Sequence, residues 1–405
     1  MAFAELNITS NFTFLTGASH PEEYVDRAAL LGLKAIAIAD ENSVAGIVRA
    51  HTRVREIARQ VKERTESALI GPPRPVDRWA GKPQVTESYP GGSQRRRTGT
   101  LAPEEVEDFL DGPKAAFETR RTPPPLDASA AILNVPRLIP AARLVLDTGF
   151  TVTALPKDRQ GWANLCRMIS RGRLRAEKGS CQLRIDDLVE FGANLALLIH
   201  PPDAQTAKHG MDGWQHAARR LTRRFGPDCY LLLAPKYDGQ DPERFDHLAG
   251  LAKEMRLETI ASAAPIMHHG NRRKLADVLT AVRTGSRVDD LGRAALANGE
   301  QRLRSETDLC RFFGKHTAAV TRAADLADSL TFSLDELRYE YPSEIAQGET
   351  ASERLARLAH EGLKWRYPSG ALDKVKTLLA HELTLIGKLE YEPYFLTVRD
   401  IVAFA

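Results

Sequence analysis

The chain has 405 residues, of which 43% are hydrophobic and 27% are charged, and its formal net charge is +3. This composition is typical of a folded globular protein, and the length exceeds what one hydrophobic core usually supports, so we expect two domains. The longest apolar runs, such as residues 195–199, have the length of strands rather than the ~20 residues of a membrane span, and no signal-peptide pattern opens the sequence. We therefore expect no membrane association and a cytoplasmic location.

The cysteines and the charge give weaker indications. The four cysteines lie far apart and form no C-x-x-C pair, which argues against a zinc ribbon and against a disulfide framework. The small positive charge permits a nucleic-acid partner but does not indicate one.

The first fifty residues predict a strand, a helix and a second strand. Residues 3–9 alternate as a strand does, and a helix follows with Pro21 in its first turn and Gly32 at its end. Residues 35–39 form a short apolar run that ends at Asp40, which is typical of a buried parallel strand. This strand-helix-strand unit indicates an α/β fold.

Residues 61–136 interrupt the pattern with many prolines and glycines, so we expect a poorly ordered insertion there. We expect one short helix inside it, at 103–110. The run of three arginines at 95–97 is interpreted as a solvated part of the loop.

After the insertion, regular structure resumes at 137–146, and predicted strands then alternate with predicted helices. A closed barrel of parallel strands fits this pattern best, and a doubly wound sheet is the alternative. The expected strands are 151–155, 195–200, 229–234 and 258–263, and the expected helices are 160–171, 215–224 and 241–255.

From residue 272 onward the pattern is almost entirely helical, with apolar residues three and four positions apart. We therefore expect a domain boundary near 270, with an α/β domain at 1–270 and a helical segment at 271–405. The helices expected in the second part are 275–283, 306–313, 317–328, 352–366 and 373–389.

The chemistry of parallel sheets gathers at the C-terminal ends of the strands, and a metal or catalytic site is to be sought there. Most of the side chains at these positions are poor metal ligands. The candidates are Asn7, Thr9, Asp40, Glu41, Arg143, Lys236, Tyr237, Ala264, Ile266 and His268.

Residues 3–18 and 35–40 resemble the opening of the PHP domain of bacterial polymerase III alpha subunits, most closely the error-prone branch of that family. Further similar segments lie at 275–283, 332–342, 381–386 and 394–402. The resemblance implies a PHP-type distorted parallel β/α barrel, followed by an all-α segment that leads into a polymerase palm.

Metal-binding members of the family carry His-x-His after the first strand and Asp-His after the second. This chain has Asn7 and Thr9 at the first pair and Asp40-Glu41 at the second, and Arg143 stands where a glutamate ligand is expected. Asp40 and His268 alone cannot form a site, so we interpret both as structural. The sequence thus predicts no metal-binding, catalytic or cofactor-binding residues in this segment.

The resemblance implies part of an error-prone, DNA-directed DNA polymerase of translesion synthesis and DNA repair. The catalytic aspartates are expected beyond residue 405, and magnesium and DNA are implied for the complete polymerase. Other translesion-synthesis proteins and the sliding clamp are the candidate protein partners. Two alternatives remain open: an independent metal-dependent PHP phosphoesterase, and a free-standing interaction module from a truncated gene.

Overall fold

The computed structural model describes residues 3–70, 135–202, 210–338 and 348–404. They form two compact units, Met1–Glu336 and Leu337–Ala405. Most of the expected insertion, with its expected helix at 103–110 and its basic run at 95–97, lies outside the described residues. In the described parts of the chain, no helix is both long enough and apolar enough to cross a membrane.

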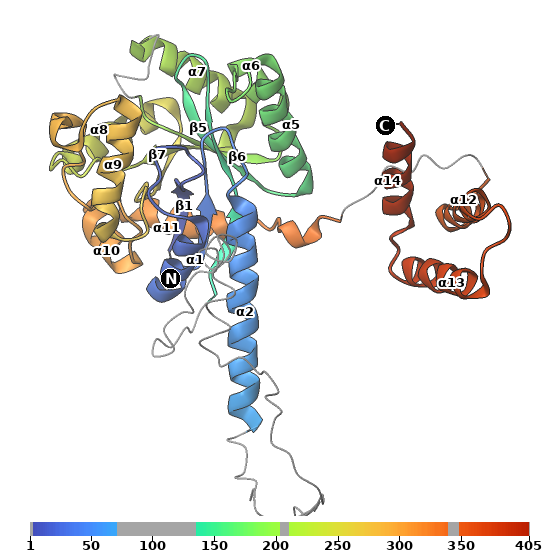
Figure 1. Cartoon of the computed structure of the whole chain (residues 1–405). Helices are drawn as coiled ribbons and strands as arrows, with labels where there is room; N and C mark the ends of the chain where they lie inside the picture. Colours follow the sequence, from blue (N-terminus) through green and yellow to red (C-terminus); the bar gives the residue numbers. More distant parts are fainter. Residues whose placement is uncertain (1–2, 71–134, 203–209, 339–347, 405) are drawn as a thin grey trace, which may run out of the picture. The chain divides into compact units, whose positions relative to one another are not determined.

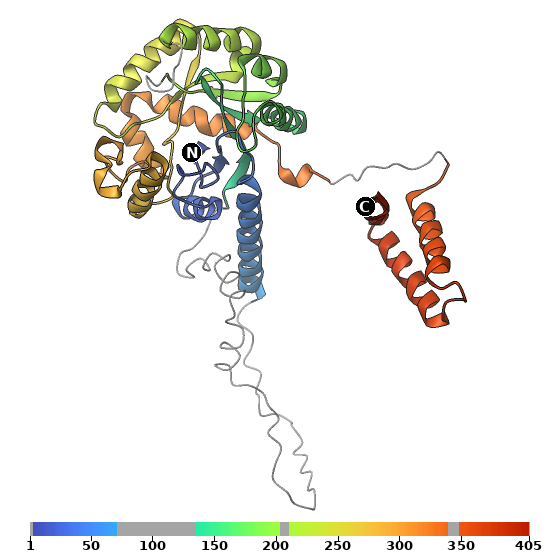
Figure 2. The same cartoon turned by 45° about the horizontal axis from the view of Figure 1, so that its top comes forward.

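Strands occupy the centre of the first unit and helices surround them (Figure 1), as the turned view also shows (Figure 2). Within the described residues, one sheet has the order β1-β2-β3 and the other has the order β4-β5-β6-β7-β8. The strands are β1 (Ala4–Ile8), β2 (Ala35–Ile38), β3 (Arg137–Pro140), β4 (Ala142–Val145), β5 (Thr151–Pro156), β6 (Leu195–Ile199), β7 (Cys229–Leu233) and β8 (Glu258–Ala261). The helices are α1 (Pro21–Leu31), α2 (Ile47–Ile70), α5 (Arg159–Arg175), α6 (Ile185–Phe191), α7 (Gly210–Phe225), α8 (Asp241–Met255), α9 (Arg273–Thr284), α10 (Glu306–Phe313) and α11 (Thr317–Ser329).

The expected strand-helix-strand opening is confirmed. His20 and Glu23 form a capping box at the start of α1, and Gly32 ends the helix with a φ of 68°, a conformation that glycine adopts without strain. The parallel strands β1 and β2 on either side of α1 are buried along their whole length. Such strands need covering on both faces, which places them in the interior of the unit.

The expected distorted barrel is confirmed, but its strands are not all parallel. β5 pairs in antiparallel orientation with both β4 and β6, while the other ladders are parallel. Only the five residues 146–150 separate β4 from β5, which is too short for the crossover that a parallel pair requires. The strand order follows the chain order in both sheets, which disfavours the doubly wound alternative.

No ladder joins strands β1 and β8 in the described residues. At this seam between β1 and β8, hydrogen bonds to a side chain connect the two strands instead. The carboxylate of Glu5, with no exposed surface, accepts hydrogen bonds from the Ser262 hydroxyl and from the Ala263 N–H, the latter at 2.8 Å. The Asn7 N–H also donates to this carboxylate, at 3.1 Å. Burial raises the pKa of Glu5 to about 7.

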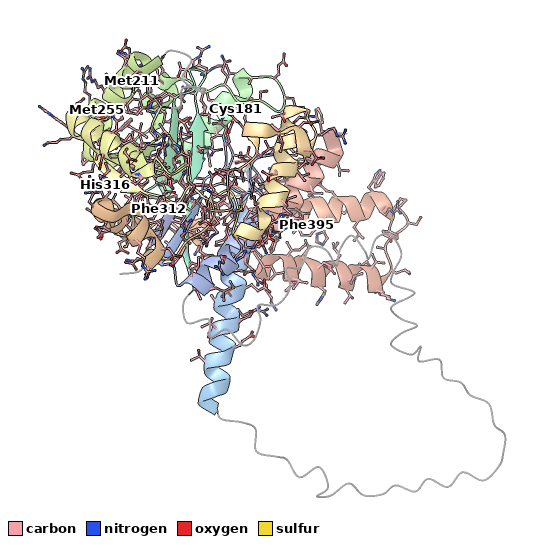
Figure 3. All side chains as sticks on the ribbon, turned by 90° about the vertical axis from the view of Figure 1, so that its left-hand side faces the viewer. Cys181, Met211, Met255, Phe312, His316 and Phe395 are labelled. Carbon is pink, nitrogen blue, oxygen red and sulfur yellow. The ribbon has the colours of Figure 1, made fainter. Side chains whose placement is uncertain are left out.

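Helices α10 and α11 bury their apolar faces in the same core as the strands. Phe313 of α10 stacks on Phe245 of α8 with ring centroids 4.7 Å apart. The neighbouring Phe312 and His316 lie on the side of the unit that carries Met255 (Figure 3). The chain therefore divides into compact units after Glu336, and the expected boundary near 270 does not coincide with this division.

The start of the insertion also differs from the expectation. Helix α2 continues past residue 61 to Ile70, and Ile57 and Val61 pack against the hydrophobic core. Beyond Val61 the described side chains, at positions 62, 63 and 65, are exposed, so packing against the core does not account for the extra turns.

Strand β3 is tied to α11 by Arg137, whose guanidinium donates to the backbone carbonyls of Ala327 and Leu330. Carbonyls at the end of a helix have no partner within the helix, so removing this cation leaves them partly unsatisfied. We expect Arg137→Ala to lower the free energy of unfolding by about 1–3 kcal/mol in urea denaturation. Arg59→Ala, at an exposed position of α2, is the control and should change it by less than about 0.5 kcal/mol. Equal effects of the two substitutions would argue against this role of Arg137.

The second unit consists of helices with incompletely buried apolar faces. Its helices are α12 (Ala351–Arg366), α13 (Asp373–Lys388) and α14 (Glu392–Phe404). Thr350 and Glu353 form a capping box at the start of α12. Leu396 is the one buried hydrophobic residue among those described in this unit, while Trp365 is 81% exposed.

Candidate ligand-binding cleft

A cleft of about 690 Å³ opens where the sequence predicts a site, at the ends of β1, β6 and β7. Among the described residues, two cations, one carboxylate and several neutral polar groups line it, together with an apolar wall. The polar lining residues used below are Asn7, Thr9, Glu41, Arg143, His200 and Lys236. Of the other sequence candidates, Ala264 and Ile266 also line the cleft.

Asn7 belongs to a hydrogen-bond chain that crosses three strands. The Thr153 hydroxyl of β5 donates to Asn7 Oδ1 at 2.8 Å, and it lies 2.8 Å from Nε2 of His200, which follows β6. A hydroxyl has one proton, so His200 must donate to Thr153 from Nε2. Loss of water around the imidazole, together with the nearby Arg143, lowers the pKa of His200 to about 3, so this histidine is neutral.

Arg143 spans the cleft floor between the first two strands. Its guanidinium donates to Thr9 Oγ1 at 3.1 Å and to Glu41 Oε2 at 3.3 Å. Its backbone N–H donates to the carbonyl of Asp40 at 3.0 Å, which fixes β4 against the end of β2. A guanidinium is always positive and carries only donors, so it cannot bind a metal ion.

Asp40 does not line the cleft. Its carboxylate accepts from the N–H of Ser10 at 2.8 Å, from the hydroxyl of Ser10 at 2.7 Å and from the hydroxyl of Thr13 at 2.8 Å. Burial is the largest influence on its pKa and raises it, and the hydrogen bonds oppose this effect. Asp40 therefore holds the loop after β1 in place.

His268 is held by Ser19. The Ser19 hydroxyl lies 2.8 Å from its Nδ1, and its backbone N–H donates to the same hydroxyl at 3.0 Å. Glu23 is 3.8 Å from the ring, and burial lowers the pKa of His268. Asp40 and His268, the two side chains that resemble metal ligands, are thus each hydrogen-bonded to hydroxyl groups of the protein.

The remaining candidate, Tyr237, supports the cleft from behind. Its hydroxyl donates to the Ala263 carbonyl at 3.0 Å, and its backbone has a φ of 55°. Ala264 is also in the left-handed region, with a φ of 47°. Strained backbone of this kind is concentrated where the chain turns sharply to build a site.

The residues present do not fit a divalent metal. The described residues contain no group of three or more His, Cys, Asp or Glu side chains placed to hold an ion. Arg143 and Lys236 place positive charge in the cleft, and the Asn7 amide nitrogen is a hydrogen-bond donor. Tight binding of a divalent ion needs several converging ligands such as carboxylates, imidazoles or thiolates, so no catalytic step can be derived through an ion here.

Three polar residues of this region were not among the sequence candidates. Glu5 lies within the first strand. A charged residue at a buried strand position is unusual, and this is the sequence signal that could have pointed to Glu5. Thr153 gives no signal, because threonine is common in strands. His200 stands at the end of a predicted strand, and its partner lies on another strand.

The structural interpretation of Asp40 can be tested by two substitutions. Asp40→Ala removes the acceptor of three hydrogen bonds and should lower the free energy of unfolding by about 2–3 kcal/mol. Asp40→Asn keeps one acceptor oxygen and can donate to Ser10 Oγ, so it should cost about 1 kcal/mol or less. Chemical denaturation measures both, and an equally large loss in Asp40→Asn would contradict the interpretation.

Comparison with protein families agrees with this geometry. The PHP domain family matches residues 5–231, more than half of the chain, and the chain therefore belongs to the PHP domain family. The family described as the bacterial DNA polymerase III alpha NTPase domain matches residues 353–405.

The similar curated proteins are error-prone DNA polymerases. The chain is 40% identical over its whole length to the error-prone DNA polymerase of Ruegeria pomeroyi, of which it covers 33%, and 34% identical to that of Sinorhizobium medicae, of which it covers 29%. It thus spans about a third of the length of these relatives. A solved structure of a putative metal-dependent phosphoesterase from Bifidobacterium adolescentis matches 65% of this chain and 87% of its own, with 11% identity and a TM-score of 0.35.

Proposed function

We propose that this chain is part of an error-prone, DNA-directed DNA polymerase that acts in translesion synthesis and DNA repair in the cytoplasm. The observation that carries the proposal is the 40% identity to an error-prone polymerase over the whole chain. Under this proposal DNA is the substrate and magnesium serves the complete polymerase. The sliding clamp and other translesion-synthesis proteins are the proposed partners.

We propose further that the PHP domain is a non-catalytic scaffold at 1–270 and that 271–405 leads into the polymerase palm. The side chains of the cleft support the first part, because donors and cations stand where metal ligands are required. The apolar side chains exposed on α12 to α14 support the second, since such a surface is usually covered by a partner or by another domain.

A chimera tests the polymerase proposal. The corresponding part of the Ruegeria pomeroyi error-prone polymerase is replaced by this chain, and primer extension with magnesium is measured. We expect extension to be retained, because the two sequences align over this whole chain. A folded chimera without extension would contradict the proposal, and a thermal unfolding curve shows whether the chimera is folded.

Metal analysis tests the scaffold proposal against an independent phosphoesterase. The purified chain is dialysed against zinc or manganese and then against buffer, and bound metal is measured by mass spectrometry. We expect well below one equivalent, because Arg143 repels a divalent ion and Asn7 and Thr9 are weak ligands. One equivalent or more, together with metal-dependent release of nucleotide from DNA, would favour the phosphoesterase.

A further inference from the structure

We propose that the outer face of helix α7 binds the sugar–phosphate backbone of duplex DNA, independently of base sequence. The inference rests on the proposed polymerase function for the identity of the ligand, and it assigns the contact to a surface outside the cleft. Three features of the described residues carry it: arginines gathered on one helix face, the lack of an acidic partner for two of them, and the lack of an aromatic platform beside them.

Helix α7 carries its apolar and its basic residues on different faces. Trp214, Ala218 and Leu221 are buried in the core of the first unit. Arg219 and Arg223, about one turn apart on the same side of the helix, are exposed. The helix lies on the outside of the unit next to α6 (Figure 1). Packing of the apolar face thus holds the two arginines at the surface with a fixed spacing.

Arg219 and Arg223 have no acidic partner in the described part of the chain. Neither guanidinium forms an ion pair there, whereas Arg220 of the same helix pairs with Asp186 of α6. A guanidinium that is not paired keeps its donors free for phosphate oxygens, which it contacts in bidentate geometry. None of these three arginines is among the described residues that line the cleft at the strand ends.

An open depression of about 530 Å³ lies along this face of α7. Its described lining residues include three arginines and a single carboxylate, and they are Asp212, Gln215, His216, Arg219, Arg220 and Arg223. The formal net charge of the whole chain is only +3, so the depression is a local concentration of positive charge. Such a patch attracts polyanions even where the net charge of the protein is small.

The surroundings of the arginines favour duplex DNA over a single strand. No Phe, Tyr or Trp is among the described residues that line the depression, and Trp214 of the same helix is 5% exposed. Proteins that bind single strands without sequence preference stack the bases on exposed aromatic rings. A duplex keeps its bases stacked inside and presents its phosphates, with one negative charge per ~1.7 Å of helix axis. Arginines without an aromatic ring beside them match this backbone.

Fluorescence anisotropy of the purified full chain with a labelled DNA duplex, at a series of salt concentrations, tests the proposal. We expect binding that weakens as the salt concentration rises, because contacts to phosphate release counterions. Arg219→Gln together with Arg223→Gln should weaken binding by about tenfold or more at low salt and reduce the slope of log K against log salt by about 2. The change in slope follows from the loss of two phosphate contacts, each of which contributes about 0.9.

Arg55→Gln together with Arg59→Gln is the matched control. These arginines have the same spacing on an exposed part of α2, but each lies 3.9 Å from a carboxylate, that of Asp335 and that of Glu63 respectively. The control removes the same charge from another face of the protein. Its affinity for the duplex should stay within about twofold of that of the unchanged chain, with the same salt slope.

Arg219→Lys together with Arg223→Lys separates charge from side-chain shape. It keeps both charges and should bind within about threefold of the unchanged chain, since contacts to the backbone depend chiefly on charge. Circular dichroism checks the fold of each variant, and both side chains are exposed. If the double glutamine variant does not fold, each single substitution to glutamine should still reduce the salt slope by about 1.

Four results overturn the proposal. They are a lack of salt-dependent binding, a double glutamine variant that binds as the unchanged chain does, a lysine variant as weak as the glutamine variant, and a single strand that binds more tightly than the duplex of the same length. None of them bears on whether the chimeric polymerase extends a primer, because the test measures binding by this chain and not synthesis. The two proposals therefore fail separately.

Discussion

Glu5→Ala should lower the free energy of unfolding by roughly 3–5 kcal/mol, one of the two largest effects expected in this protein. The Glu5 carboxylate accepts hydrogen bonds from Asn7, Ser262 and Ala263 at the seam between β1 and β8. Alanine leaves these donors buried without a partner and opens a cavity at the closure of the barrel. Urea denaturation followed by circular dichroism measures the loss.

Glu177→Ala is the matched control, because Glu177 is exposed just after α5. It should change the free energy of unfolding by less than about 0.5 kcal/mol. A Glu5→Ala variant as stable as the control would show that the seam is closed in some other way.

The same carboxyl group makes the stability depend on pH. Its pKa is raised from 4.5 to about 7 in the folded chain, mainly by burial. Between these values the unfolded chain has released the proton and the folded chain has kept it, so a rise in pH favours unfolding. This stabilisation is fully present below pH 4.5 and is lost as the pH rises to about 7, a difference of about 3 kcal/mol.

Glu5→Gln tests the pH dependence, because glutamine does not titrate. The free energy of unfolding, measured at pH 5 and pH 8, should fall less in Glu5→Gln than in the unchanged chain. The variant also places an amide N–H against one of the donors around Glu5, so its stability should be lower at pH 5. Identical pH dependence in the two proteins would refute the assignment to Glu5.

Gly17→Ala should have the second large effect, a loss of more than about 3 kcal/mol in the free energy of unfolding. A Cβ at this position would lie 2.0 Å from the backbone oxygen of Ser10. Ser10 donates twice to Asp40, so moving its backbone also breaks the hydrogen bonds that hold the loop after β1. Because the obstacle is backbone, no side-chain rotation relieves it.

Gly250→Ala is the control for Gly17→Ala. Gly250 lies in α8, and an added Cβ meets nothing within 4 Å. Alanine is a better helix former than glycine, so this variant should be more stable by about 0.5–1 kcal/mol. Opposite signs of the two changes in thermal unfolding are the expected result, and a tolerated Gly17→Ala would mean that the loop has room to move.

The sequence by itself determined the elements whose signals are local. The predicted bounds of α8 and α10 agree with the structure, because caps and apolar spacing lie within each helix. The resemblance and the strand pattern together predicted a distorted barrel, and the strand ends located the cleft. The structural roles inferred for Asp40 and His268 remain predictions, and the substitutions of Asp40 described above test the first of them.

Contacts between distant residues were decided by the tertiary structure alone. The antiparallel pairing of β4, β5 and β6 depends on where the chain turns, and the strands themselves carry no signal for it. The hydrogen-bond chain of Asn7, Thr153 and His200 joins residues up to 193 positions apart. Glu5, in the first strand, accepts a hydrogen bond from Ser262, which directly follows β8. Burial then sets the protonation of Glu5 and His200, because the cost of removing water from a charge arises only when the fold encloses it.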